Sequence, residues 1–263
     1  MSGPRVFWIS GEDRLDLSSP SPVLYPGPPL SRHLVKSLRA APGDIFSFAL
    51  PDPPGSLFQG TVVGLCPFSV SLRQIPLERG GSKKRPFYIG VALLKGESWE
   101  DLIEPLVCLG ARSLIPLMTD RSQIRWSQEQ YSRKKIRFET KIREASQLSG
   151  RTDRMDLPPP VFLENLLETF LGSVLFFDED PGARPVGAVL SSMTGTSPLL
   201  ALIGPEGGWS SRERTFLRDY KGAKKSEPVS LGSLILPGRV APIVAASLLS
   251  FCSEETSIER SIS

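Results

Sequence analysis

The chain has 263 residues, of which 40% are hydrophobic and 22% are charged, and its formal net charge is +3. That length allows one sizeable core or two smaller ones, and we expect two domains. No apolar run approaches the roughly 18–20 residues needed to cross a bilayer, and the first residues lack the cationic and apolar segments of a signal peptide. We therefore expect a soluble, cytoplasmic protein with no membrane partner.

The cysteine and histidine residues decide whether disulfides or metal sites are expected. Cys66, Cys108 and Cys252 stand far apart with no CxxC pair, and the chain has one histidine. Neither a disulfide framework nor a metal site is therefore predicted.

Charge is distributed unevenly along the chain. Residues 1–85 carry ten Lys and Arg against six Asp and Glu, whereas residues 152–263 carry ten against fourteen. The basic front half could bind a polyanion, although a solvated surface explains the excess equally well.

The first eighty or so residues are predicted to form a small β-barrel. Their short apolar or alternating runs, separated by Gly and Pro turns, are typical of strands and lie at 45–50, 61–63 and 68–73. Segments 26–29 and 51–55 are predicted loops, because proline fixes φ and removes a backbone donor. Segment 78–85 combines glycine and charge without an apolar residue, which indicates a linker.

After the linker, strands and helices alternate, as in a parallel α/β sheet. Strands are predicted at 86–94, 113–118, 173–177 and 199–203. Helices are predicted to begin at Ser98, Ser127 and Ser210, each with a polar capping partner three residues on. Pro105 should bend the first of these helices and Gly110 should end it. Along the second, the predicted buried face is formed by Tyr131, Phe138, Ile142 and Ala145.

The last predicted helix, 239–251, is apolar on nearly every face. Such a helix must pack in a core or against another subunit. The residues after it, 253–263, contain too little apolar surface to pack and are expected to be mobile.

Segment 203–213, IGPEGGWSSRE, is the clearest candidate for a binding site. Its glycines allow the backbone to approach a ligand closely, and the amides at the following helix start can donate to polar ligand atoms. A tight strand-to-helix turn without special purpose is the alternative. The pattern is neither GxGxxG nor a Walker phosphate loop, so the usual nucleotide folds are not indicated.

A second glycine-containing segment, VSLGSLILPGRVAP at 229–242, precedes the last helix. The Gly-Pro-Glu-Gly-Gly turn followed by Leu-Gly-x-x-Ile-Leu resembles the RsmE-type family of 16S rRNA uracil-N3 methyltransferases, which belongs to the SPOUT superfamily. HLVKSLRAAPGD at 33–44, the stretch 95–122 and EASQLSGR at 144–151 are similar to further motifs of that family, in the same order. The resemblance spans roughly residues 5–250.

The resemblance implies a PUA-like β-barrel RNA-binding domain at 1–82 and an α/β SPOUT methyltransferase domain at 83–252. The C-terminal part of the latter would be threaded into a trefoil knot, a topology that general folding rules would reject as very rare. The cofactor would be S-adenosyl-L-methionine, held largely by backbone groups of the two turns. The cofactor-binding residues would be Ile203, Gly204, Pro205, Glu206, Gly207, Gly208, Leu231, Gly232, Ile235 and Leu236. The family is also dimeric, which would explain the apolar last helix.

Two segments depart from the family pattern. Leu148 stands where the family has glutamine, and Pro237, Gly238 and Arg239 replace a polar Arg-Thr-Glu run. An arginine cannot act as a general base at neutral pH, since guanidinium stays protonated. Our first candidate catalytic residue is Arg239, which would stabilise the uracil anion or hold a phosphate of the target strand, although it could merely pair with an acidic neighbour. The second is Arg151, which stands where the resemblance places a conserved arginine.

The predicted RNA contacts are basic residues of the front half together with an arginine after the second strand of the α/β domain: Arg5, His33, Lys36, Arg39, Lys83, Lys84 and Arg121. A structural role for His33 and a solvated role for the arginines remain open. Glu206 could order the cofactor turn or simply be stabilised by the helix dipole.

The function implied is S-adenosylmethionine-dependent methylation of N3 of a specific uridine in 16S rRNA, with the assembled small ribosomal subunit as the partner and a homodimer as the working form. Two alternatives stay open. The chain could methylate another RNA base, or it could be a non-catalytic RNA-binding or ribosome-assembly protein that retains the fold.

Overall fold

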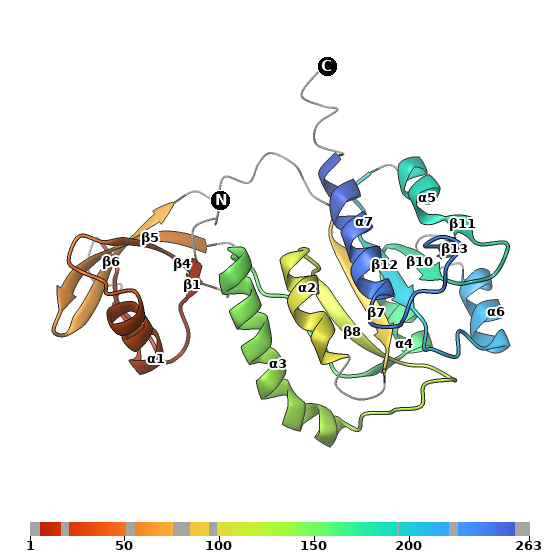
Figure 1. Ribbon diagram of the computed structural model, residues 1–263, viewed down its shortest axis with the longest axis horizontal. Coiled ribbons are helices and arrows are strands. Elements are labelled where there is room, and N and C mark those ends of the chain that lie inside the picture. Colours follow the sequence, from red (N-terminus) through yellow and green to blue (C-terminus); the bar gives the residue numbers. More distant parts are fainter. Residues whose placement is uncertain are drawn as a thin grey trace, which may run out of the picture. The chain divides into compact units, whose positions relative to one another are not determined.

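A computed structural model of the chain describes residues 6–16, 21–50, 56–75, 85–94, 99–193, 195–220 and 226–255 (Figure 1). The chain divides into two compact units, one of Met1–Arg79 with Arg143–Arg154 and the other of Gly80–Ile142 with Met155–Ser263. Segment Arg143–Arg154, which falls in the range expected for the second domain, therefore groups with the first unit.

The first unit contains a six-stranded sheet with the order β1-β4-β5-β6-β3-β2. β1 and β4 are parallel, and the other pairs are antiparallel. The three strand runs predicted in this part of the chain all lie within observed strands. The strands are β1 (Val6–Trp8), β2 (Arg14–Asp16), β3 (Val23–Tyr25), β4 (Ile45–Leu50), β5 (Ser56–Leu65) and β6 (Phe68–Ile75).

One predicted loop of this unit is wrong in its second half. Pro28 and Pro29 open helix α1 (Pro28–Arg32). Proline fits there because the N–H groups of a first turn have no partner within the helix. α1 continues into a one-turn π-helix, η1 (His33–Ser37), whose Leu34 is fully buried in the unit's core. The predicted loop at 51–55 and all but the last residue of the predicted linker lie outside the described residues.

The second unit is built on a seven-stranded sheet with the order β11-β13-β10-β12-β7-β8-β9, in which every pair is parallel. All four strands predicted here are confirmed, and their buried residues explain why they are apolar throughout. The strands are β7 (Phe87–Ala92), β8 (Ser113–Met118), β9 (Val161–Phe162), β10 (Ser173–Phe177), β11 (Arg184–Pro185), β12 (Leu199–Ile203) and β13 (Ser226–Ser230).

The helices of this unit mostly follow the predicted capping signals. Ser127 and Gln130 form reciprocal hydrogen bonds at the start of α3, and Ser210 with Glu213 forms a capping box on α6. The predicted helix near 98–109 divides into a 3₁₀ turn and an α-helix, which places Pro105 in the first α-helical turn, where its missing donor costs little. The helices are η2 (Glu100–Leu102), α2 (Ile103–Cys108), α3 (Gln128–Ser149), α4 (Leu163–Thr169), α5 (Val186–Ser192), α6 (Ser211–Asp219) and α7 (Ala241–Glu255).

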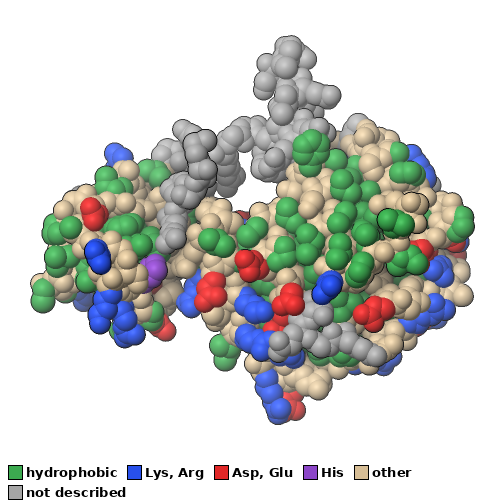
Figure 2. Space-filling model, in the orientation of Figure 1, with side chains coloured by type: hydrophobic (Ala, Val, Ile, Leu, Met, Phe, Trp, Pro, Cys, Tyr) green, Lys and Arg blue, Asp and Glu red, His purple; other side chains and the backbone are tan. Residues whose placement is uncertain are grey.

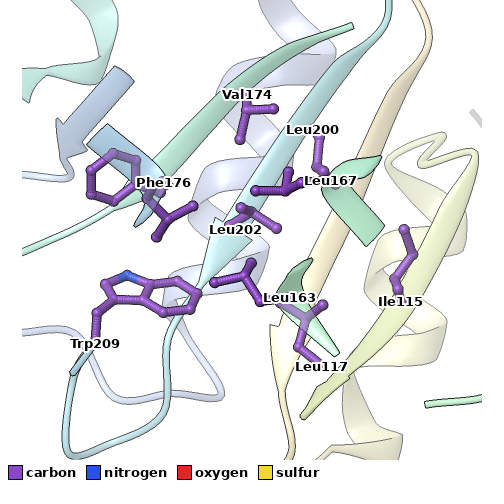
Figure 3. Close-up of a cluster of buried hydrophobic side chains, with 10 residues drawn as sticks. Ile115, Leu117, Leu163, Leu167, Val174, Phe176, Leu200, Leu202 and Trp209 are labelled. Carbon is purple, nitrogen blue, oxygen red and sulfur yellow. The ribbon is translucent and has the colours of Figure 1, made fainter. Parts of the chain in front are cut away.

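Helices cover both faces of the parallel sheet (Figure 1). α4 and α6 pack on one face, where Leu167 and Leu217 join strand residues in a buried cluster, whereas α2 and α7 lie on the other. Figure 3 shows the cluster, with Leu202 of the central strand β12 among residues of β8, β10 and α4. The indole of Trp209 closes the cluster and donates a hydrogen bond to the Phe177 carbonyl at 2.8 Å.

α7 is largely apolar, as the sequence predicted. Ala241, Ala245, Ala246 and Leu249 are buried, whereas Phe251 is 60% exposed. The helix continues to Glu255, so the first three residues of the predicted mobile tail are helical. The rest of that tail lies outside the described residues. Among the described residues, no helix combines the length and apolar character that a membrane span requires.

We expect Leu202→Ala to lower the free energy of unfolding by about 3 kcal/mol, because it leaves a cavity in the centre of the buried cluster. Urea denaturation of the purified chain measures this loss. Leu171→Ala is the control, since Leu171 is 76% exposed and its truncation should change the value by less than about 0.5 kcal/mol. Equal losses for the two variants would contradict the packing described here.

Candidate functional site at the carboxyl edge of the parallel sheet

The two glycine-containing segments leave the sheet from strands on either side of β10. The register aligns Ile203 at the end of β12 with Phe177, and it aligns Val229 of β13 with the same residue. Because neighbouring strands lie about 4.8 Å apart, turn 204–208 and loop 231–236 start at the same level of one sheet edge, roughly 10 Å from each other. The carboxyl edge of a parallel sheet is where open α/β folds bind their ligands.

The packing and backbone conformation of turn 204–208 favour glycine at two positions. A Cβ atom at Gly204 would lie 3.0 Å from the Trp209 ring, so any other residue would force the indole or the turn to shift. Gly208 adopts a φ of +65° and donates to the Pro205 carbonyl at 2.7 Å. Gly207 differs, since a Cβ there would make only ordinary contact with Arg121, at 3.7 Å.

The loop that follows β8 braces this turn from the side. The guanidinium of Arg121 donates to the Gly207 carbonyl at 2.8 Å, and the Asp120 amide donates to the buried Glu213 carboxylate at 2.8 Å. Asp120 in turn accepts hydrogen bonds from Ser210 and Arg212. These donors hold the pKa of Asp120 below its ordinary value, the Arg212 hydrogen bonds contributing most. Arg121, predicted as an RNA contact, therefore supports the turn.

Loop 231–240 crosses the sheet edge from β13 to β7. Gly232 has a φ of +128°, and its amide donates to the Ser230 hydroxyl at 3.1 Å. Farther along, a Cβ at Gly238 would lie 2.8 Å from a methyl carbon of Leu94, just beyond the end of β7. The loop thus passes the ends of β10 and β12 before α7 begins, because these strands stand between β13 and β7 in the sheet.

The side chains along this loop differ strongly in exposure. Leu231 and Leu236 are half-buried, whereas Leu234 and Ile235 are 81% and 75% exposed. Arg239 is exposed at the end of the loop and, within the described part of the chain, has no side-chain hydrogen bond or ion pair. On the other turn, Pro205 is buried and Glu206 is exposed.

The ion pair between the buried Asp178 and the partly exposed Arg214 is a feature that sequence reasoning missed. Asp178 follows β10 directly, is 7% exposed, and accepts two hydrogen bonds from Arg214 of α6, at 2.8 and 2.9 Å. Its amide also donates to the Val229 carbonyl of β13. The pair raises the pKa of Arg214 and ties α6 to the strand between the two glycine segments. An acidic residue directly after an apolar strand run was the available signal.

The structure does not group Arg151 with Arg239. Arg151 belongs to the first unit, where its 8% exposed side chain forms an ion pair with Asp153 at 2.9 Å. Its carbonyl accepts a hydrogen bond from the Trp8 indole. The catalytic role that we predicted for Arg151 competes with this structural one, because the guanidinium is already engaged.

The predicted RNA contacts of the first unit are accessible where they are described. His33 and Lys36 are exposed on η1, and the His33 ring lies 5.9 Å from that of Phe7. Arg39 is exposed with a φ of 54°, a conformation that non-glycine residues seldom adopt. Arg5, Lys83 and Lys84 lie outside the described residues. Among those described, no group of three or more His, Cys, Asp or Glu side chains could hold a metal ion.

A family model for the RNA methyltransferase domain matches residues 82–250. The chain belongs to this RNA methyltransferase family. The match covers β7 to α7 and therefore both glycine segments, and it confirms the family to which the sequence motifs pointed. It also includes Arg143–Arg154, which the structure groups with the first unit.

Relatives and solved structures agree with this membership of the RNA methyltransferase family. The chain is 29% identical to ribosomal RNA small subunit methyltransferase E of Synechocystis over 219 residues, covering 81% of this chain and 68% of that protein. The Bacillus subtilis protein of the same name is 29% identical over 173 residues, covering 64% and 66%.

Two solved structures share the fold. A putative methyltransferase of Legionella pneumophila, in complex with S-adenosylmethionine, matches with a TM-score of 0.70 and 24% identity over 95% of this chain and 98% of that one. A ribosomal RNA small subunit methyltransferase E of Neisseria gonorrhoeae, bound to the same compound, matches with a TM-score of 0.70 and 18% identity over 93% and 96%.

We expect Gly204→Ala to lower the free energy of unfolding by about 1–3 kcal/mol, because the new methyl group meets the Trp209 ring, which its hydrogen bond to Phe177 holds in place. Gly207→Ala is the matched control in the same turn and should change stability by less than about 0.5 kcal/mol. Thermal or urea unfolding compares them. A larger loss for Gly207→Ala would show that the turn is built differently.

Proposed function

We propose that this chain is an S-adenosylmethionine-dependent methyltransferase that modifies N3 of a uridine in 16S rRNA of the small ribosomal subunit. The observation that carries the proposal is the arrangement of turn 204–208 and loop 231–236 at one level of the sheet edge, within a domain of the RNA methyltransferase family. Relatives named for methylation of small-subunit rRNA, and neighbours of the same fold bound to S-adenosylmethionine, support it.

The residues at this edge fit an adenosine-containing cofactor. The turn offers backbone amides and carbonyls without bulky side chains, through Gly204, Gly207 and Gly208. The loop offers apolar surface to wall an adenine, since Ile235 is 75% exposed and Leu231 and Leu236 are half-buried. Ile203, Pro205, Glu206 and Gly232 complete the proposed set. When bound, S-adenosylmethionine supplies the electrophilic methyl group for the uracil nitrogen.

The chain's own task in such a transfer is placement and charge stabilisation, because the uracil imide must lose a proton and become anionic. Arg239 stands at the end of the cofactor loop with an exposed guanidinium, which can stabilise that anion or a neighbouring phosphate but cannot accept the proton. Arg121 would act on the cofactor indirectly, because its hydrogen bond to the Gly207 carbonyl holds turn 204–208 in shape.

Finer features of the fold belong to the same proposal. The path of loop 231–240 past the ends of β10 and β12, followed by the packing of α7 on β7 and β12, supports a C-terminal trefoil knot. The six-stranded sheet of the first unit supports a PUA-like RNA-binding domain, with a SPOUT domain at about 83–252. His33, Lys36 and Arg39 would then contact RNA from exposed positions.

A homodimer through α7 completes the proposal. Figure 2 shows hydrophobic side chains gathered over α7, and Phe251 on that helix is 60% exposed. A second copy of the chain would cover this surface with an identical one, as two-fold dimers do. The rRNA substrate implies that the enzyme works in the cytoplasm.

We expect calorimetry to detect binding of S-adenosylmethionine to the purified chain, and small ribosomal subunits from a strain lacking this gene to accept a labelled methyl group from it. Arg239→Ala should slow the transfer by about two orders of magnitude with cofactor affinity nearly unchanged, as when a charge-stabilising group is lost. Lys135→Ala, an exposed charge on α3, is the control.

The outcomes separate the candidate functions. Cofactor binding without transfer to the correct subunit would favour a non-catalytic RNA-binding or ribosome-assembly protein, which the altered segment 237–240 makes a specific rival. Transfer to another base, mapped on the labelled RNA, would retain the enzyme and change its target. Absence of heat at millimolar cofactor would refute both the site and the function.

We expect light scattering at micromolar concentration to give twice the chain mass of 28.8 kDa. Phe251→Asp should shift the species toward the monomer, because a carboxylate would be buried in the interface. Leu171→Asp, at an exposed residue preceding β10, is the control and should leave the mass unchanged. A parent protein of single-chain mass would contradict the proposed dimer.

A further inference from the structure

Glu100 of η2 is a buried carboxylate held by three cations from α3. It is 2% exposed, and Arg137 donates to one of its oxygens through Nε at 2.6 Å and through a second nitrogen. The ammonium of Lys134 lies 3.1 Å from the other oxygen, and that of Lys141 lies 3.8 Å from the oxygen that Arg137 binds. Burial by itself would raise the pKa of Glu100, but Arg137 and Lys134 outweigh it, so the pKa lies below its ordinary value.

This cluster holds more positive charge than one carboxylate requires. Arg137 alone provides two donors to Glu100, so both lysines add charge to a site that is already paired. Positions 134, 137 and 141 share one face of α3, and their side chains stay 38%, 50% and 36% exposed. Elsewhere on the helix, Arg133 and Lys135 each have an acidic partner four residues away.

The aromatic residues around the cluster fix its position. Trp99 is fully buried and donates to the Val91 carbonyl of β7 at 3.4 Å, and its ring lies 5.1 Å from that of Trp126. Trp126 packs in turn on Phe138 of α3, and the Lys134 ammonium lies 5.5 Å from its ring. The cations therefore project from a packed support and do not belong to a freely moving surface.

The same support places the cluster beside the candidate site. Val91, which Trp99 contacts, is aligned with Ile203 at the start of the cofactor turn. Leu94, a few residues before Glu100, touches Gly238 of the cofactor loop. The cations and both glycine segments thus adjoin the carboxyl edge of β7 and β12, within one unit of the chain.

We propose that Lys134, Arg137 and Lys141 form a phosphate-binding stripe that contacts the RNA backbone next to the target nucleotide, with Glu100 holding the three side chains in register. The inference rests on the proposed function, because it assigns the stripe to the same RNA substrate. Three like charges close together repel one another, and a polyanion relieves that repulsion as it releases its own counterions. Lysine and arginine are the side chains that proteins use for phosphate.

Binding of a 16S rRNA transcript, measured at several salt concentrations, tests the stripe. The double variant Lys134→Gln with Lys141→Gln leaves Arg137 on one oxygen of Glu100, and the amide introduced at position 134 can still donate to the other. We expect its affinity to fall roughly ten-fold near 0.1 M salt, and the slope of log K against log salt to decrease by about one per lysine. Arg133→Gln with Lys135→Gln removes the same charge from the same helix and should keep the parental slope. Equal effects of the two pairs would overturn the proposal.

A second variant separates the stripe from a purely structural ion cluster. Glu100→Gln removes the carboxylate charge that the three cations surround but keeps a side-chain oxygen that can accept their hydrogen bonds, so RNA should bind more tightly and with a steeper salt dependence, even where thermal stability falls. Unchanged or weaker RNA binding by this variant would count against the stripe. If Glu100→Gln does not fold, the comparison of the two double variants of α3 still tests the stripe.

The two proposals fail in different ways. S-adenosylmethionine binding and methylation of small subunits by the parent test the function without reference to α3. A parent that methylates while the two double variants of α3 behave alike would retain the function and remove the stripe. A parent that binds RNA through the stripe but binds no cofactor would retain the stripe and remove the proposed function.

Discussion

The parallel register between β10 and its two neighbours is the constraint on which the candidate site depends. Ile203 and Val229 both align with Phe177, so the segments that follow β12 and β13 must leave the sheet at one level. A slip of one residue in either pair would turn the buried side chains of that strand to the opposite face. Because helices cover both faces of the sheet, such a slip would leave the strand buried but would break the packing around Leu202 and Trp209. The core therefore determines the geometry of the edge.

Charged groups at this edge hold the backbone in place, and several of them come from distant parts of the chain. Asp120 and Arg121 reach turn 204–208 from the end of β8, and Asp178 reaches α6 from the end of β10. Removing Arg214 would leave the buried carboxylate of Asp178 without its charged partner, which costs several kcal/mol. A turn that is held from two sides loses little further conformational freedom when a ligand binds, which favours affinity.

The departure from the family pattern at residues 237–239 has a partial physical explanation. Gly238 lies against Leu94 where the loop crosses to β7, and a side chain at this position would require Leu94 to move. A tight crossing with Pro237 and Gly238 therefore replaces a polar run, and Arg239 is the one charged group left at that point. The positive charge of Arg239 and of the α3 stripe has the sign that an RNA substrate requires on this side of the sheet.

The sequence by itself determined what depends on near neighbours in the chain. The buried strands, the capping pairs Ser127–Gln130 and Ser210–Glu213, and the apolar face of α3 follow from composition and spacing within a few residues. The motifs also indicated the family, and they predicted the two segments that we propose bind the cofactor. Only the tertiary structure decided which side chains meet across long separations, as Arg121 meets Gly207 and Glu100 meets Arg137. Such contacts depend on the order and register of strands, because these bring residues together whatever their distance along the chain.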